Sequence, residues 1–526
     1  MDRLTGYIVT AAVVATAVTI VFFMKTDPDK GDKMTDESYL NAAFLKYQPA
    51  SSYDPIKIQF SPEYVFLENI YSPLLENNAE GEIVSGIAER YEWVGPELHF
   101  RLRQNLKTID GRPIDARDVE RSFKRVLLLR GGTHTDLADA VCPGVTLKKI
   151  DDFCPGMEVR ENNRLFVVKL AKKNASILKM FTSMDLAVIP SGSIDPETFA
   201  ISDYRNTSGP YYVERDDAEG RILLAANPAH YHYSPKIPQK VRLVPAGKNG
   251  ARESVELFSQ GKVDYIMSCD KAGPEILTSY AAERPEEVRL HSTAPFHLHM
   301  IAFTRKGISR FNGNERFKIG TAFKRIYLDR ALKTPGTEEA SQIIPAFGTE
   351  TLTDAQKASL NGLFQQAGPD EVFPQKILAW NLSMADLFKN EEAVLRRIFP
   401  NTRIEIGRSV PALTDFGKSG SEEPDLIFVT IDMGFQESIG RMSYMTNVGL
   451  FYAPGMDAKK WVSEYVAIED KAERISKARK LHYDTLAHAC AVPMMWAPYT
   501  AIVRKPWQTA FSKIYPDSHL WRIYRN

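Results

Sequence analysis

Two places in this chain carry side chains that could bind a polar ligand or a metal. The first is Asp432, a carboxylate that directly follows the apolar run DLIFVTI at residues 425–431. Such a run predicts a buried strand. Because an unpaired buried charge is unfavourable, Asp432 is either an ordinary strand-end aspartate or a group that faces a polar ligand.

The second place is the histidine-rich segment HSTAPFHLHM at residues 291–300. On a strand, His297 and His299 share one face. Together with His291 they could ligate nickel, copper or zinc, because imidazole suits all three metals. The alternative is that these histidines are structural residues that form hydrogen bonds within the fold.

Catalytic motifs are missing from the sequence. The patterns G-x-S-x-G, H-E-x-x-H and the phosphate-binding loop do not occur. No pair of carboxylates is set apart by its surroundings, so nothing indicates general acid–base chemistry. We therefore expect a protein that is not an enzyme and that holds no cofactor.

Length and charge limit the remaining possibilities. A chain of 526 residues predicts about three domains or subdomains. Lys plus Arg and Asp plus Glu both number 66, so the chain has no net charge that would attract nucleic acid. We expect no nucleic-acid partner.

The N-terminus carries an uncharged segment, residues 4–24, that is long enough to cross a bilayer. Its bulky end, IVFFM at residues 20–24, differs from the small-residue exit of a cleaved signal peptide. We expect a transmembrane helix within residues 1–25, followed by a polar linker at residues 26–38. Cleavage of this segment as a signal peptide is the alternative.

Four cysteines are present, and two of them lie in similar surroundings. Cys142 and Cys154 each precede Pro-Gly and bracket a short segment. In an oxidising compartment this spacing predicts a local disulfide, and two unrelated buried thiols are the alternative. Cys269 and Cys490 are expected to be small buried apolar residues.

The pattern of apolar residues predicts short strands that alternate with helices, which indicates an α/β protein. Strands are expected at residues 98–102, 164–170, 185–190, 222–227, 241–244, 263–266, 377–380, 403–406 and 425–429. Helices are expected at residues 174–181, 252–260, 317–327, 384–398 and 471–490.

A turn followed by a helix start stands at residues 110–123, DGRPIDARDVERSF. Gly111 suits the turn, and Asp115 is a good N-cap with Asp118 at the third helical position. This run resembles the signature of the family 5 extracellular solute-binding proteins, the peptide- and nickel-type receptors of ABC importers. Further segments resemble motifs of the family in the same order, at residues 53–55, 69–75, 87–93, 100–103, 208–212, 227–231, 251–266 and 503–507.

The resemblance implies an α/β, two-lobed, periplasmic-binding-protein-like (class II) fold with an extra subdomain in the N-terminal lobe. Lobe I is expected to comprise residues 39–295 and 497–526, including the subdomain at about 55–200. Lobe II is expected to comprise residues 296–496. The two hinge crossings are expected near residues 294–303 and 491–500.

The resemblance also implies a ligand enclosed between the lobes. In peptide-binding members an aspartate placed like Asp432 holds the α-ammonium of the peptide, although Val429 stands where the family has a tryptophan. Trp496 and Tyr499 lie in the second hinge, PMMWAPY at residues 493–499, where the family places an aromatic residue against the ligand. The expected ligand-binding residues are Asp432, Met433, Trp496, Tyr499 and Tyr53.

By this resemblance the chain is a monomeric receptor for oligopeptide-like solutes that delivers them to the permease subunits of an ABC importer. It would work on the periplasmic side of the bacterial inner membrane, anchored by the N-terminal helix, or in the periplasm if that helix is cleaved. Two alternatives remain. One is an anchored sensor or assembly protein that keeps the fold without transport, and the other is a nickel-type metal-chelate receptor that uses His297 and His299.

Overall fold

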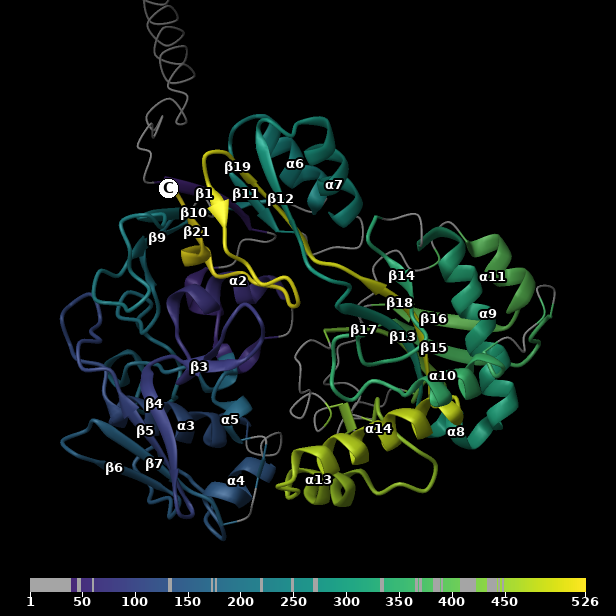
Figure 1. Ribbon diagram of the computed structural model, residues 1–526, viewed down its shortest axis with the longest axis horizontal. Coiled ribbons are helices and arrows are strands. Elements are labelled where there is room, and N and C mark those ends of the chain that lie inside the picture. The colour runs from purple at the N-terminus through teal and green to yellow at the C-terminus, as the bar shows by residue number, and fades with distance from the viewer. Residues whose placement is uncertain are drawn as a thin grey trace, which may run out of the picture. The chain divides into compact units, whose positions relative to one another are not determined.

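The described residues form three larger β-sheets and two sheets of two strands each (Figure 1). The three larger sheets have separate apolar cores. The structure is a computed structural model. It describes residues 39–526 apart from 45–48, 59–60, 131–134, 172–173, 176, 218–220, 247–249, 268–272, 332–334, 365–367, 369–370, 382–387, 389–390, 407–421, 433–441, 443–444 and 447–448.

The largest sheet has seven strands in the order β12-β19-β11-β1-β10-β9-β8. In chain order these are β1 (Tyr39–Phe44), β8 (Tyr211–Asp216), β9 (Ile222–Ala226), β10 (Lys240–Pro245), β11 (Tyr265–Met267), β12 (Val288–Ser292) and β19 (Thr500–Arg504). Helices α6 (Ala251–Ser259) and α7 (Gly273–Glu283) bury Phe258 and Leu277 against one face. Helix α2 (Ser61–Ile70) buries Phe66 in the core on the other face.

The second sheet has six strands in the order β14-β18-β13-β17-β15-β16. They are β13 (His297–Phe303), β14 (Glu338–Glu339), β15 (Ile377–Asn381), β16 (Thr402–Ile406), β17 (Leu426–Asp432) and β18 (Ala491–Ala497). Helices α9 (Gly313–Ala331) and α11 (Glu392–Ile398) share one core with this sheet. Helices α10 (Asp354–Asn361), α13 (Ala458–Val466) and α14 (Lys471–Ala487) share the core on its other face.

The third sheet belongs to a subdomain and has the order β4-β5-β7-β6. Its strands are β4 (Ala88–Val94), β5 (Glu97–Leu102), β6 (Met157–Arg160) and β7 (Leu165–Lys169), and helices α3 (Ala116–Arg130) and α4 (Thr135–Val141) pack beside them. The start of α3 is capped as predicted: Asp115 accepts from the Arg117 N–H, and Asp118 accepts from the Asp115 N–H.

The remaining elements are short. They are η2 (Ala50–Ser52), η3 (Pro55–Lys57), β2 (Leu75–Asn77), β3 (Ile83–Ser85), α5 (Ile177–Met180), η5 (Met184–Leu186), η6 (Ser191–Ser193), α8 (Arg305–Arg310), β20 (Gln508–Thr509), η8 (Leu520–Arg522) and β21 (Ile523–Tyr524).

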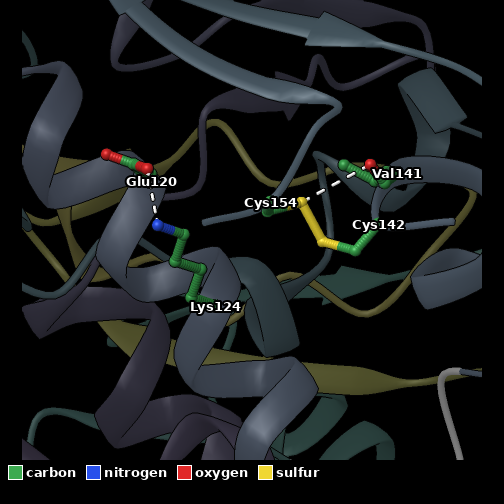
Figure 2. The surroundings of a disulfide bond; sticks show 5 residues. All are labelled: Glu120, Lys124, Val141, Cys142 and Cys154. Carbon is green, nitrogen blue, oxygen red and sulfur yellow. Dashed lines mark hydrogen bonds and ion pairs between the residues drawn. A yellow bond between two sulfur atoms is a disulfide. The ribbon is translucent and has the colours of Figure 1, made fainter. Parts of the chain in front are cut away.

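The predicted disulfide between Cys142 and Cys154 is present in the subdomain, with the two Cα atoms 5.0 Å apart (Figure 2). Both cysteines are buried in the subdomain core, and Sγ of Cys154 lies 3.4 Å from the Val141 carbonyl oxygen. Beside it, Lys124 and Glu120 form a 2.7 Å ion pair on α3. Cys490 is a buried free thiol, and Cys269 lies outside the described residues.

The chain passes between the two large sheets twice, once from β12 to β13 and once from β18 to β19. The two passages lie side by side and are hydrogen-bonded to each other. The Thr293 N–H donates to the Tyr499 carbonyl at 2.9 Å, and the Tyr499 N–H donates to the Thr293 hydroxyl at 2.9 Å. Each passage therefore restrains the other.

Some expected elements differ from the observed ones. Residues 185–190 do not form a strand, because η5 covers their start and only Val188 makes a bridge, to Ser72. For the helix expected at 384–398, the described residues contain α11 from Glu392 and Phe388 in a left-handed backbone conformation (φ 57°), while 384–387 and 389–390 lie outside the described residues. Of the helix expected at 174–181, the described residues form only the short helix α5 (Ile177–Met180).

The N-terminal predictions fall outside the described residues, since the expected transmembrane helix and linker lie within residues 1–38. Within the described parts of residues 39–526, no helix is both long enough and apolar enough to span a bilayer. The membrane anchor therefore stays a prediction.

The disulfide should stabilise the protein measurably. Closing a loop between residues 12 apart corresponds to about 3 kcal/mol in the chain-entropy model. We expect the double variant Cys142→Ser/Cys154→Ser to lower the free energy of unfolding in urea by about 2–3 kcal/mol. Wild-type protein in dithiothreitol is the matched control and should resemble the variant. Equal stability with and without reductant would contradict the prediction.

His482 on α14 should make stability depend on pH. Its Nε2 accepts from the Ile343 N–H at 2.9 Å, and its Nδ1 lies 3.2 Å from the Glu350 carbonyl, so the buried ring is neutral. Burial lowers the pKa of His482 from 6.5 to about 4. Because the folded pKa is depressed, its contribution is complete above pH 6.5 and is lost as pH falls toward 4, at most about 3 kcal/mol.

The test is urea unfolding at several pH values between 7.5 and 4.5. We expect His482→Gln to flatten the decline in stability over this range, because glutamine does not titrate there. His488→Gln is the control, since His488 is exposed at the end of the same helix. An unchanged slope in His482→Gln would show that other groups cause the decline.

Candidate functional site

Asp432 ends strand β17 and lies next to two other strand residues in one row of the second sheet. The antiparallel register places Asp432 directly opposite His297 of β13, and His297 opposite Ala497 of β18. Directly paired residues in adjacent strands project their side chains on the same face. The row therefore brings the Asp432 carboxylate and the His297 imidazole together.

Three side chains meet at this point, and we refer to Asp432, His297 and Tyr499 as the Asp432 cluster. Asp432 Oδ1 pairs with Nδ1 of His297. The Tyr499 hydroxyl donates to the same carboxylate and lies 3.3 Å from each of its oxygens. The side chains of His297 and Asp432 are 27% and 25% exposed, so the cluster is accessible to a small ligand.

Tyr499 is held in place by both passages between the sheets. Its backbone is fixed by Thr293, and its ring packs against Phe296 at a centroid distance of 6.3 Å. Tyr515, from the C-terminal tail, completes this small apolar cluster. The hydroxyl therefore reaches Asp432 from a restrained backbone.

The predicted residue Trp496 lies on the other face of the same sheet. It is directly paired with Leu298, which alternates with His297, and both side chains are buried in the core shared with α13 and α14. Trp496 is 3% exposed. The structure thus separates Trp496 from the Asp432 cluster.

Tyr53 lies in the core of the seven-stranded sheet. Its ring centroid is 4.8 Å from that of Phe66, and its carbonyl accepts from the Tyr204 hydroxyl at 2.5 Å. Met433 lies outside the described residues. Of the five expected ligand-binding residues, the structure brings together Asp432 and Tyr499.

The three histidines considered as metal ligands have separate partners. His291 is in the other large sheet, on β12, where its Nε2 lies 2.8 Å from the Ser512 carbonyl oxygen. His299 is buried, with Nδ1 2.5 Å from the Tyr327 hydroxyl. Among the described residues no group of three or more His, Cys, Asp or Glu is placed to hold a metal ion.

His297 is the residue of the cluster that the sequence alone did not connect with Asp432. The two residues are 135 positions apart, and their contact depends on the register of β13 against β17. The available signal was weak: a polar residue at the start of one apolar strand and another at the end of a second. In antiparallel neighbours these two ends meet.

A cavity of about 630 Å³ lies away from this cluster, along the subdomain. Three cationic side chains, two carboxylates and several apolar residues line it. The lining side chains include Arg121, Lys148, Lys149, Asp151, Glu197, Ile150 and Phe199. The opposite charges largely offset one another, and none of the expected ligand-binding residues lines it.

A comparison with family models gives one match. Residues 82–324 match the middle region of the bacterial extracellular solute-binding proteins, family 5. The matched range begins in the subdomain and extends through β13 into α9. It includes the turn and helix start at residues 110–123.

Curated relatives match at low identity. The periplasmic oligopeptide-binding protein OppA of Salmonella typhimurium is 24% identical over 298 residues, 54% of this chain. The match spans 51% of OppA, so the chain covers about half the length of this relative.

Solved structures share the fold over nearly the whole chain. The murein tripeptide-binding protein MppA of Escherichia coli superposes with a TM-score of 0.67 at 17% identity, covering 93% of this chain and 98% of MppA. Haemophilus influenzae OppA, in complex with the peptide RPPGFSPFR, gives a TM-score of 0.69 at 16% identity, covering 93% and 99%. At such identities the likeness shows the mixed α/β, two-lobed binding-protein fold.

Proposed function

Because the chain belongs to family 5 of the bacterial extracellular solute-binding proteins, we propose that it is a receptor of an ABC importer that binds oligopeptide-like solutes. The observation that carries the proposal is the Asp432 cluster. It presents a carboxylate at the end of a buried central strand, as the resemblance predicts for the group that holds a peptide ammonium.

The chemistry of the cluster suits a cationic amine. A hydrogen bond between an ammonium and a carboxylate is charge-assisted, and it is stronger than a neutral one. Partial burial weakens solvent screening around Asp432, while His297 and Tyr499 fix the orientation of the carboxylate. The site would therefore orient a peptide by its amino end.

The other expected ligand residues take secondary roles in this proposal. Met433 follows Asp432 directly in sequence and would border the same ligand. Trp496 and Tyr53 are each 3% exposed and would support the binding surface from within the two cores. Tyr499, through its hydroxyl, would be the aromatic residue nearest to the ligand amine.

The proposal includes a location and partners. The apolar N-terminal segment would anchor a monomer on the periplasmic side of the inner membrane, where the importer's permease subunits receive the solute. The disulfide between Cys142 and Cys154 supports an oxidising compartment such as the periplasm. The relative OppA is a periplasmic oligopeptide-binding protein.

Native mass spectrometry of the full chain, purified in detergent from an oxidising compartment, tests the proposal. We expect a mixture of co-purified peptide masses in the wild type. Asp432→Asn should lower peptide affinity about 10- to 150-fold and remove most of these masses, because asparagine keeps the shape of the side chain but loses its charge.

Asp354→Asn is the matched control. Asp354 is a fully exposed residue in the first turn of α10, so this variant should retain the peptides. A wild-type chain that carries no peptide, or a single non-peptide molecule, would count against a peptide receptor. Peptides that persist in Asp432→Asn would count against the role given to Asp432.

A further inference from the structure

Residues 511–519 of the C-terminal tail, which we call the tail strap, are fastened to the first passage between the large sheets, the one from β12 to β13. The Ala294 N–H of this passage donates to the Lys513 carbonyl at 2.6 Å. His291, near the end of β12, has its Nε2 2.8 Å from the Ser512 carbonyl oxygen. The tail strap therefore restrains the start of this passage directly.

The tail strap is also fixed to the hairpin formed by β2 and β3. The Tyr515 hydroxyl donates to the Asn78 carbonyl at 2.7 Å. The Ser512 hydroxyl donates to the Ala79 carbonyl at 2.6 Å. The ring of Tyr515 belongs to the same small apolar cluster as the ring of Tyr499. The tail strap thus bridges the hairpin and the residues beside the candidate site.

Asp517 joins the parts of the tail strap to one another. Its buried carboxylate accepts from the Ser512 N–H at 2.9 Å and pairs with the Arg522 guanidinium. Nδ1 of His519 lies 2.8 Å from the same carboxylate. Burial opposes the charge of Asp517, but His519 and Arg522 outweigh it and lower its pKa to about 2. Asp517 is therefore an ionised acceptor around neutral pH, and Nδ1 of His519 donates to it.

His519 lies among groups that favour its positive charge. Facing it are the carboxylates of Asp517 on the tail strap, Glu68 on α2 and Glu76 on β2, and the cation of Arg522 on η8. Burial opposes protonation, but Glu68 and Asp517 outweigh burial and raise the pKa of His519 above its usual 6.5. The ring therefore stays charged at a pH where an ordinary histidine has lost its proton.

Two of these carboxylates come from elements packed against the tail strap. Glu76 pairs with His232 at 2.8 Å; burial opposes its charge, but the bond with His232 lowers the pKa of Glu76 to about 2. Glu68 accepts from the Ser518 hydroxyl, and burial raises the pKa of Glu68. Glu76 is thus ionised around neutral pH, whereas Glu68 takes up a proton more readily as the medium becomes acidic.

We propose that the tail strap is a pH-sensitive restraint on the first passage, which is firm while His519 is charged and loosens when His519 becomes neutral. A hydrogen bond from an imidazolium to a carboxylate is stronger than one from a neutral ring. Because the folded pKa of His519 is raised, its contribution is complete below about pH 6.5 and is lost as pH rises through the folded value.

The consequence reaches the candidate site through Thr293, which lies in this passage and fixes the Tyr499 backbone. Tyr499 is therefore held most firmly while His519 is charged. This inference goes beyond the proposed function, because it concerns the restraint on the passage and is tested without a ligand.

Backbone hydrogen exchange of the full chain in detergent, resolved to single residues by mass spectrometry, measures the restraint. The reporters are the N–H groups of Ala294 and Ser512, since each donates a hydrogen bond to the tail strap. Their protection factors, which correct for the effect of pH on the chemical exchange rate, should fall about fivefold between pH 6 and pH 9. The amides of β7, in the subdomain core, are the internal control.

His519→Asn removes the titration and keeps a donor. The amide nitrogen of asparagine takes the place of Nδ1 and can donate to Asp517, but it does not titrate. We expect the fall in protection to disappear, with values at pH 6 close to those of the wild type at pH 9. His488→Asn is the matched control, because His488 is exposed on α14, and it should keep the wild-type profile.

Glu68→Gln guards against a folding defect in the first variant. Glutamine keeps an acceptor for the Ser518 hydroxyl but removes the charge that faces His519 from α2. The pH at which protection falls should therefore move to a lower value. Exchange of the Cε1 hydrogen of His519, whose rate depends on protonation of the ring, should show the same displacement.

Equal protection of Ala294 and Ser512 at pH 6 and pH 9 would overturn the inference, as would a wild-type profile in His519→Asn. A fall at Ser512 alone would also overturn it, because the tail strap would then loosen without releasing the passage. None of these measurements needs a bound peptide. A chain that carries no peptide would therefore count against the proposed function and leave this test intact.

Discussion

The antiparallel register of β17, β13 and β18 is the constraint on which the candidate site depends. It sets Asp432 opposite His297. Both residues lie at the strand ends from which the chain passes to the other large sheet. A slip by one residue would place His297 opposite Ile431 and turn Asp432 toward the apolar core on the other face. The buried residues on both faces therefore fix the register, and with it the pairing of the two polar side chains.

The partners that the described residues offer Asp432 differ from those of three other carboxylates in the protein. Those three are nearly or fully buried, and each pairs with the permanent cation of an arginine. The pairs are Asp54–Arg125, Asp425–Arg310 and Asp517–Arg522. Breaking a buried pair of this kind is costly, so these pairs serve the fold. Among the described residues, the Asp432 carboxylate is bonded instead by a histidine and a tyrosine.

Local sequence features predicted local structure well. The cap of α3 by Asp115, the disulfide and most strands follow from short-range patterns and agree with the structure. Residues 185–190 failed as a strand because their apolar side chains pack into cores without a neighbouring strand that pairs along their length. The Asp432–His297 contact was beyond reach, because it depends on a register between distant strands. Likewise, Trp496 and Tyr499 lie in one short sequence motif. The motif alone does not show that strand β18 ends between these two residues.

Tyr499 links the candidate site to the passages between the sheets. Its hydroxyl lies 3.3 Å from both oxygens of Asp432, which is longer than the usual distance of about 2.7–2.8 Å for such a bond. The carboxylate therefore has room to tighten this contact. Because Thr293 fixes the Tyr499 backbone, a small rotation of the two passages would move the hydroxyl relative to Asp432. The position of the Tyr499 hydroxyl relative to Asp432 thus depends on the geometry of the passages.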